Sequence, residues 1–485
     1  MLVVPVLLGS AAYGASIAPG DVGLRHDIQV LADYGVITGP VSTWPLDWRA
    51  IAADIHAAGD QTDLSPAVLS SLYRVEQRLQ RSLQSDKPFY SAGISFAEDP
   101  TRIRAFSNTP REKAELAAGI RWTNDRIVVD LNVQGVESPA DGDDVRADGS
   151  LLGVNLGNFT IAASTMERWW GPGWDGSLIL SNNARPIPSL TINRGETKPF
   201  KSKWLSWIGP WDMSVMWGQL EKERVIPNAK FIGFRFNFRP FDSLELGITR
   251  TAQWCGDGRP CGLDTFTDLL IGNDNIGEGG VTAENEPGNQ MAGFDFRWST
   301  TRFGTPVALY GQMIGEDEAG GFPSRYLALG GAEMSGLSEN GRWSYRWYAE
   351  FAGTSCDFVK DDLFNCAYNQ GIYQSGYRYQ GRAIGHGADN DALIASFGVM
   401  VVGRDDNRFG AIFRAGNLNR GGGFDARNTV TPVALDLLSI DLEYSREFGG
   451  GRVEIGAGFQ GLENVAGGST TTDLRAYLSW SIYDL

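Results

Sequence analysis

The sequence predicts a mainly β protein, a transmembrane antiparallel β-barrel of about 18 strands that follows a short helical segment. Three observations support this fold class. Many segments of about ten residues alternate apolar and polar side chains, which gives a strand one apolar and one polar face. The connections between these segments alternate between short turns and long loops. No apolar run reaches the roughly 18 residues that a transmembrane helix needs.

The alternation fixes how each strand is oriented. In residues 434–446 a slip by one position would turn Asp441 and Glu443 towards lipid, and a charge at the bilayer midplane costs roughly 2–4 kcal/mol for Arg or Lys and less for Asp or Glu. We expect strands near 91–97, 114–123, 126–137, 149–156, 158–168, 211–220, 230–239, 243–252, 290–299, 305–314, 325–336, 341–353, 392–402, 407–416, 434–446, 451–461 and 472–484, with segments 176–182 and 188–194 less certain.

Connection lengths test the strand assignment independently. Short turns are expected at 240–242, 300–304, 337–340, 403–406 and 447–450, and longer loops at 253–289, 315–324, 354–391, 417–433 and 462–471. Outer-membrane barrels have short periplasmic turns and long outer loops. An even strand number therefore places the C-terminus and the helical segment in the periplasm. Before residue 230 the alternation of short turns and long loops requires one strand fewer or more than the count of segments gives. One segment between 158 and 220 is therefore expected not to be a wall strand.

The N-terminal part of the chain has a different character. Residues 2–8 form an apolar run, and small residues follow up to a signal-peptidase site before Ala15, so we expect a signal peptide over 1–14 that lacks its basic region. A buried strand is the alternative. Residues 20–84 show helical spacing, with Asp47 and Ser65-Pro66 as helix starts. We expect a three-helix bundle over 20–84 that packs against a barrel over 90–485.

Composition and cysteine spacing limit the function. The net charge is −16, which argues against nucleic acid as a partner. The four cysteines form two local pairs in predicted loops, and in an exported protein each pair is expected to be a disulfide. Zinc is the rival, but neither pair has a CxxC spacing or a nearby His. No metal site and no cofactor are expected. The pairs are Cys255 with Cys261 and Cys356 with Cys366.

The long loops contain the candidate binding residues. Loop 354–391 is rich in tyrosine, which offers sugars an apolar face and a hydrogen-bonding tip. Its candidate glycan-binding residues are Tyr368, Tyr373, Tyr377, Arg378 and Tyr379. The alternative is that they pack the loop around its cysteine pair. Loop 253–289 is acidic, which disfavours a uronic-acid polymer unless divalent cations bridge the two.

Two other features of the sequence could carry chemistry. The tryptophan cluster at 169–174 is either a sugar-stacking platform or, the favoured interpretation, an anchor at the membrane interface beside a tight turn. The three histidines, His26, His56 and His386, do not assemble into a Ser–His–acid arrangement, and an enzyme is not expected.

Three stretches resemble a known family. They are Leu24 to Ile28 with Gly35 to Ile37 and Thr43 to Pro45; Met166 to Pro172 with Ser177 to Ala184, Pro186 and Pro188; and Trp217 to Glu221 with Ala229 to Arg235. Together they resemble the capsule-assembly outer-membrane proteins, the Wzi-like surface lectins. The resemblance implies an 18-stranded barrel closed at its periplasmic mouth by three helices, and a role in attaching capsular polysaccharide or exopolysaccharide to the cell surface.

The function predicted from the sequence is therefore a non-enzymatic outer-membrane lectin that anchors surface polysaccharide. A porin-type channel for small solutes or oligosaccharides is the alternative. In a plugged barrel the lumen charges would pair with each other and with the helices, whereas in a porin they would line water. The expected partners are capsular polysaccharide or exopolysaccharide, outer-membrane lipid and lipopolysaccharide, around a monomeric barrel.

Overall fold

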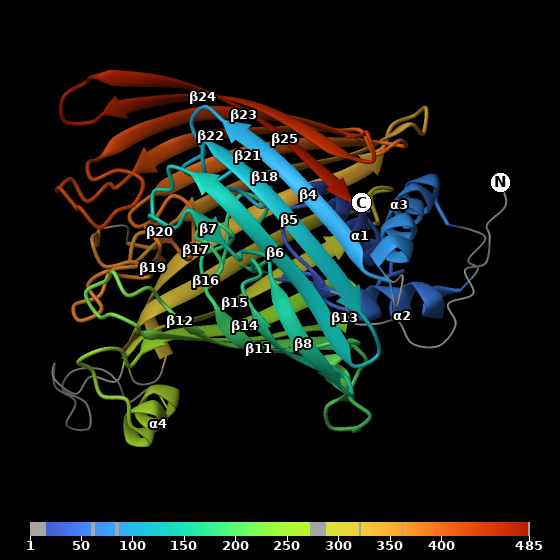
Figure 1. Cartoon of the computed structure of the whole chain (residues 1–485), viewed down its shortest axis with the longest axis horizontal. Helices are drawn as coiled ribbons and strands as arrows, with labels where there is room; N and C mark the ends of the chain where they lie inside the picture. Colours follow the sequence, from blue (N-terminus) through green and yellow to red (C-terminus); the bar gives the residue numbers. More distant parts are fainter. Residues whose placement is uncertain are drawn as a thin grey trace.

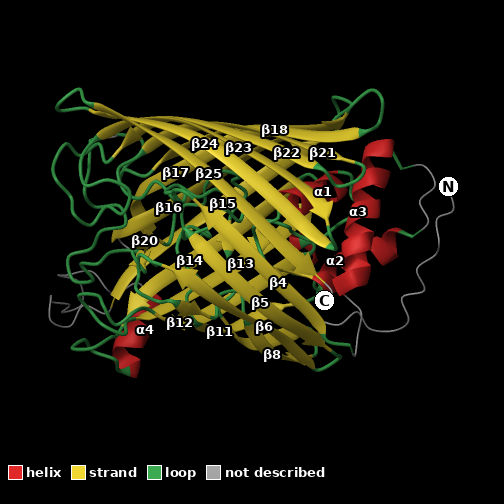
Figure 2. Cartoon of the chain, turned by 45° about the horizontal axis from the view of Figure 1, so that its top comes forward, coloured by secondary structure: helices red, strands yellow, loops and turns green. Residues whose placement is uncertain are grey.

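The chain folds into one closed antiparallel β-barrel with a helical bundle at one end (Figure 1). The computed structural model describes residues 16–59, 64–82, 87–271, 288–319, 322–360 and 362–483. The predicted signal peptide lies outside the described residues, as does much of the acidic part of loop 253–289. Figure 2 shows the three N-terminal helices gathered at the end of the barrel that also holds the C-terminus, and a further short helix, Leu263–Ile271, at the opposite end. We name this the helix end, and the opposite end the loop end.

Eighteen strand positions form the wall, so the predicted fold class is confirmed. The first half consists of β4 (Phe89–Ala97), β5 (Ala114–Thr123), β6 (Ile127–Glu137), β7 (Val145–Arg146), β8 (Leu151–Leu156), β9 (Phe159–Ser164), β11 (Ser189–Arg194), β12 (Trp211–Gln219), β13 (Lys230–Phe241) and β14 (Leu244–Trp254). Strands β7 and β8 both pair with β6 and share one position.

The second half is longer and more regular. It consists of β15 (Gly288–Thr300), β16 (Val307–Ala319), β17 (Phe322–Leu337), β18 (Trp343–Gly353), β21 (Leu393–Gly403), β22 (Arg408–Leu418), β23 (Leu435–Phe448), β24 (Gly451–Asn464) and β25 (Thr470–Tyr483). Strand β25 pairs with β4 and closes the ring. From β13 onward the short turns lie at the helix end, and the long connections after β14, β18 and β22 lie at the loop end, as predicted. The predicted loop 315–324 is wrong, because β16 runs to Ala319 and β17 begins at Phe322, and the predicted loop 462–471 shrinks to 465–469 because β24 and β25 extend into it. Before β12 the pattern breaks, since the long connection 195–210 lies at the helix end.

One predicted strand is wrong, and it explains why the count of segments and the alternation of turn lengths disagreed. Segment 176–182 lies inside the barrel, where Leu178 and Ile179 are fully buried, and is not part of the wall. It belongs to an inner segment, residues 165–188, that leaves the wall after β9 and returns at β11. Within it, β10 (Trp169–Trp170) pairs with β2 (Thr43–Trp44) from the N-terminal region. The uncertain segment 188–194 is a true wall strand.

The helical region holds three helices at one end of the barrel: α1 (Val22–Asp33), α2 (Trp48–Ala58) and α3 (Pro66–Ser82). The Asp47 side chain accepts the N–H of Arg49 and caps α2, as predicted. The small strands β1 (Ser16–Ile17) and β3 (Leu46–Asp47) pair beside it. Among the described residues, no helix reaches the length and hydropathy needed to cross a bilayer.

A single apolar cluster joins the helices to the inner segments. Trp44, Phe106 and Trp169 have no exposed surface and meet edge to face, with ring centroids 5.2 and 5.3 Å apart. The three residues come from the N-terminal region, the loop after β4 and the inner segment. The bundle therefore shares its core with loops that reach down from the loop end.

Ion pairs fix these segments to the lumen face of the wall. Arg297 of β15 contacts Asp33 of α1 and Glu333 of β17, each at 2.6 Å. Arg235 of β13 pairs with Asp295 at 2.6 Å, and both side chains are buried. The lumen charges thus pair with each other and with the helical region, as expected for a plugged barrel.

The outer face of the wall is apolar. Phenylalanine, leucine and isoleucine side chains that alternate with the lumen residues are exposed along the strands; examples are Phe234, Ile248, Phe294, Phe397 and Leu442. Because the outer face of the wall is apolar and the lumen face carries the charges, the barrel has the two surfaces that a membrane-spanning barrel requires.

Candidate functional site

The loop end is closed by a cap, which we define as residues 98–113, 354–392 and 419–434. The predicted tyrosines lie inside this cap and not on it. Tyr368, Tyr373 and Tyr377 are at most 1% exposed. The Tyr368 hydroxyl donates to the Leu178 carbonyl at 2.6 Å, and the Tyr368 and Tyr377 rings stack with centroids 5.8 Å apart. These rings connect the cap to the inner segment below it.

The remaining two candidates are buried as well. Arg378 is 4% exposed, and its guanidinium donates to Asp389, Asn369 and Asn390 at 2.7–3.0 Å. Tyr379 is 6% exposed, and burial raises its pKa to about 12. None of the five predicted side chains therefore offers an exposed ring face or a free donor to a polysaccharide in this conformation. Their position supports the alternative that they pack the loop.

The predicted cysteine pairs are joined in the structure. Cys255 and Cys261 form one disulfide, with Cα atoms 4.8 Å apart, and Cys356 and Cys366 form the other, at 5.8 Å. The first pair starts the connection that contains α4 (Leu263–Ile271). The second closes the start of loop 354–392 and so helps to hold the cap in shape.

A group of arginines at the surface of the cap was not predicted. Arg102, Arg104 and Arg111 come from the loop after β4, and Arg382 comes from β20 (Arg382–Ala383), which pairs with β19 (Arg378–Tyr379). We call them the arginine cluster. Arg102 is exposed, Arg111 and Arg382 are partly exposed, and Arg104 is buried. In the part of the chain that the structure describes, no carboxylate forms an ion pair with any of the four.

Backbone carbonyl groups hold the cluster in place. Arg382 donates to the carbonyls of Thr101 and Arg102 at 3.2 and 3.3 Å. Arg111 donates to two carbonyls of the inner segment at 2.7 Å each. Burial and then the neighbouring Arg111 lower the pKa of Arg382 to about 10. The positive charge of the cluster is partly offset by carboxylates near it, Glu112, Glu115 and Glu167. The exposed guanidinium of Arg102 makes no side-chain hydrogen bond in the described part of the chain, so its donors can bind an anionic ligand.

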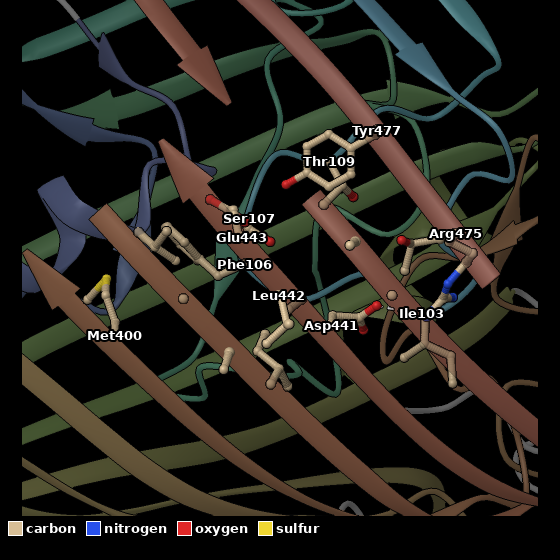
Figure 3. Close-up of a pocket in the computed structure, with 18 of the residues that line it drawn as sticks. Ile103, Phe106, Ser107, Thr109, Met400, Asp441, Leu442, Glu443, Arg475 and Tyr477 are labelled. Carbon is tan, nitrogen blue, oxygen red and sulfur yellow. Dashed lines mark hydrogen bonds and ion pairs between the residues drawn. The ribbon is translucent and has the colours of Figure 1, made fainter. Parts of the chain in front are cut away.

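A pocket lies deeper, between the cap loop 98–113 and the lumen face of strands β22–β25 (Figure 3). Ile103 and Phe106 line one side, and Asp441, Glu443 and Tyr477 line the other. Its volume of ≈ 90 Å³ corresponds to a handful of water molecules at about 10–15 Å³ each. This volume is much smaller than a polysaccharide chain.

The pocket wall is itself held by charges. Asp441 accepts from Arg414 at 2.6 Å and from Arg475 at 2.8 Å, and Arg414 also pairs with Asp175 of the inner segment at 2.7 Å. Glu350 of β18 accepts the backbone N–H groups of Trp174 and Gly176, each at 2.8 Å. These contacts bind the inner segment to the wall.

The tryptophan cluster does not face the membrane interface. Trp169 and Trp170 have no exposed surface and Trp174 is 4% exposed, all within the lumen. The anchor interpretation is therefore wrong. The ring faces serve the inner packing, because the Arg25 guanidinium lies over Trp174 at 4.1 Å. The same burial leaves no ring free for a sugar.

The sequence pattern did not single out the arginine cluster, because the tyrosines of loop 354–391 were the stronger sign of a glycan site. A signal was available, since three of the four arginines occur within ten residues, 102–111, of one predicted loop. Arg382, which completes the cluster, lies far away in sequence, and its position follows only from the folded cap.

Comparisons with known proteins agree with the architecture. The profile of the family "Capsule assembly protein Wzi" matches residues 90–473. An uncharacterised 55.8 kDa protein from the cps region of Klebsiella pneumoniae is 37% identical over 348 residues, which is 71% of this chain and 66% of that relative's length. The matched part thus spans slightly less than two thirds of the relative.

A solved structure is similar along nearly the whole chain. It is Wzi, an outer-membrane protein involved in group 1 capsule assembly in Escherichia coli and described as a carbohydrate-binding β-barrel. The identity is 29%, the TM-score is 0.84, and the match covers 96% of this chain and 99% of the other. With the family profile matched over most of its length, this chain is an outer-membrane β-barrel that belongs to the Wzi family of capsule assembly proteins.

Proposed function

We propose that this protein is a non-enzymatic surface lectin that binds capsular polysaccharide or exopolysaccharide at its cap and holds it at the outer membrane. The observation that carries the proposal is the arginine cluster on the cap of a filled barrel. The cap faces the cell exterior, and the helix end faces the periplasm. The carbohydrate binding described for the Escherichia coli relative supports the ligand class.

The cluster suits an acidic glycan. Guanidinium groups bind carboxylates through two parallel hydrogen bonds, and each charge-assisted bond contributes roughly 1.5–3 kcal/mol. Arg102 and Arg382 are neighbours, because Arg382 donates to the Arg102 carbonyl at 3.3 Å. The charge of Arg102 also acts on Arg382, so both arginines can contribute to binding one acidic stretch of polymer. Repeats of the polymer would then engage neighbouring copies of the protein with added avidity.

A non-enzymatic role is supported by the places of the histidines. His26 and His386 are at most 1% exposed, and His56 lies on α2 at the helix end. The Nδ1 atom of His386 accepts the backbone N–H of Ala388 at 3.2 Å. We therefore expect polysaccharide recovered after incubation with the protein to keep its size in gel filtration.

The channel alternative requires a continuous path of water through the lumen. The described segments instead fill the lumen, and the helical region is bound to the wall at Arg297 and Arg235. We expect planar bilayers with the full-length protein to show no large steady channel. Steady conductance from the intact protein would restore the porin interpretation.

The direct test is a double variant, Arg102→Ala with Arg382→Ala. Its matched control is Arg126→Ala, an exposed arginine in the turn between β5 and β6 at the helix end. We expect the double variant to bind a uronic-acid polysaccharide at least tenfold more weakly, since 1.4 kcal/mol corresponds to about a factor of ten. Cells that carry it should release more polysaccharide into the medium.

Two outcomes would contradict the proposal. One is unchanged binding by the double variant, and the other is an equal loss in Arg126→Ala, which would indicate an effect of overall charge. The conservative Arg382→Lys variant keeps the positive charge but loses the planar guanidinium that forms two parallel hydrogen bonds with a carboxylate. It should therefore retain only part of the polysaccharide binding. A neutral dextran measures binding that does not depend on charge.

A further inference from the structure

A closed loop lies outside the barrel at the helix end. We call residues 198–210, which connect β11 to β12, the aromatic loop. Its ends are joined, because the N–H of Trp211 donates to the Thr197 carbonyl at 3.1 Å. The N–H of Arg239 on β13 donates to the Pro210 carbonyl at 2.8 Å. In Figure 1 the loop is the green segment that projects below the right-hand edge of the barrel.

The aromatic loop is ordered by its own hydrogen bonds. The N–H groups of Leu205 and Ser206 donate to the Ser202 carbonyl at 3.1 and 2.9 Å, and a 3-10 turn, η1 (Ser206–Ile208), follows. Gly209 has φ 70°, and a Cβ there would meet the Arg239 carbonyl oxygen at 1.9 Å. Only glycine fits this position, and it holds the loop closely against the wall.

This ordered loop exposes large apolar side chains. Trp204 is 88% exposed, Trp207 is 64% exposed and Leu205 is 42% exposed. A soluble surface rarely presents two such tryptophans together on a fixed turn, because their exposure to water is unfavourable. The backbone is not free to turn them inward, so a partner that accepts indole rings is required.

The loop continues the apolar outer face of the wall. The Trp207 ring meets Phe238 edge to face at 6.3 Å, and Trp211 packs on Phe236 at 5.5 Å. Both phenylalanines alternate with the lumen-facing Arg235 and Asn237, so they point away from the lumen. Phe200 stacks on Trp211 at 4.5 Å. The membrane-facing surface thus extends over the loop to Trp204.

Positive charge surrounds the exposed rings. Lys201 and Lys203 are exposed, and in the described part of the chain neither forms an ion pair. Lys198 pairs with Glu196. Tryptophans flanked by lysines are the combination that a phospholipid interface favours, since the rings enter the headgroup region while the ammonium groups contact phosphates.

We infer that the aromatic loop is an anchor in the phospholipid leaflet on the helix side of the membrane. Trp204 and Trp207 insert into the headgroup region of that leaflet, and Lys201 and Lys203 bind its anionic phosphates. The anchor fixes the depth and the rotation of the barrel in the membrane at the strands that flank it. It makes no use of the cap, so it stands apart from the glycan proposal.

The test measures the depth of one probe in vesicles that contain the full chain. Ser206→Cys, in the 3-10 turn, carries an environment-sensitive dye, and no described cysteine is free to compete for the dye. The control site is Glu339→Cys, exposed in the turn between β17 and β18 at the same end. A dye held about 5–10 Å inside the headgroup region should show roughly fivefold weaker quenching by aqueous iodide than the control dye, and stronger quenching by brominated lipid.

Two variant pairs separate the rings from the charges. Trp204→Ser with Trp207→Ser should make the Ser206 dye as accessible to iodide as the control. Lys201→Glu with Lys203→Glu should do so only in vesicles with anionic lipid, because each lysine near such a surface favours binding by roughly fivefold.

The inference is overturned if the Ser206 dye of the otherwise unchanged protein is quenched by iodide like the Glu339 dye and ignores brominated lipid. That result would assign the loop to a protein partner in the aqueous space. All altered residues are exposed, and heat-dependent gel mobility verifies that each variant barrel is folded.

Discussion

A substitution at Phe106 can test whether the cap and the helical bundle share one packed core. The residue belongs to the loop after β4, yet its ring lies between Trp44 and Trp169, and the Arg25 guanidinium sits 4.3 Å from its centroid. It has no exposed surface. Replacing it by alanine leaves a void where three segments meet, and the surrounding rings are too rigid to fill it.

The magnitude follows from the burial. A buried Phe→Ala change costs about 3–5 kcal/mol. If the helical region opens locally while the barrel stays closed, this cost raises the open population by roughly two to three and a half orders of magnitude. Proteolysis of residues 16–82 in the folded protein should accelerate by the same factor, because cleavage follows the open population.

The assay compares Phe106→Ala with Phe303→Ala, whose ring is 77% exposed in the turn between β15 and β16. Gel mobility before and after heating reports whether the barrel remains folded. A cleavage rate within threefold of the unchanged protein would refute the view that the bundle and the cap loop share a core. Equal acceleration in Phe303→Ala would refute it as well.

Three further predictions concern the lumen, the cap and pH. Arg235→Met should lower barrel stability by about 3–5 kcal/mol, seen as a lower melting midpoint on gels, because Asp295 loses its buried partner. Removing the Cys356–Cys366 disulfide with two serines should loosen loop 354–392 by about 2–3 kcal/mol, read as faster proteolysis of that loop, since the bond closes a short segment. Burial and then nearby arginines lower the pKa of His26 well below 6.5. Below pH 6.5 the unfolded state takes up a proton on His26 that the folded state does not. The free energy of opening should therefore fall by up to about 1.4 kcal/mol for each pH unit below that value. In proteolysis rates measured against pH, His26→Gln should make this dependence weaker.

Each of these has a control. Arg235→Met with Asp295→Leu should recover most of the loss, because no buried charge is then left alone. Unchanged protein treated with a reductant should match the serine variant, and a difference would indicate that the serines themselves disturb the cap. His56→Gln changes an exposed residue, and an effect on the slope as large as that of His26→Gln would contradict the assignment to buried His26.

The wall could be predicted because its rules are local. Alternation of side chains places Asp441 and Glu443 in the lumen and Leu442 outside, and it does so without knowledge of the rest of the chain. The hydrogen bond by which Asp47 caps the start of α2 is equally local, and so is the position of the short turns between strands. The sequence also indicated the miscounted strand, because the number of strands between 158 and 220 did not agree with the alternation of turn lengths.

The candidate site could not be predicted in this way. Tyr368 and Tyr377 occur in a loop that is long, polar and rich in glycine, and such a composition is typical of a solvated loop. Their burial follows from contacts with Leu178 and Ile179, which lie almost 200 residues earlier. Whether a loop folds into the lumen or out into water depends on which inner segments meet it, and no local pattern records that.

The shared interior has a consequence for biogenesis. The segments that fill the lumen come from before β4, from the loop after it, from residues 165–188 and from the loop before β21, while the ring closes only when β25 meets β4. Insertion of Trp170 or Tyr377 into a ring that is already closed would have to pass through its ends, where the turns and loops crowd. We therefore expect the inner segments to be in place before β25 pairs with β4, so that pairing of the first and last strands is a late step of assembly.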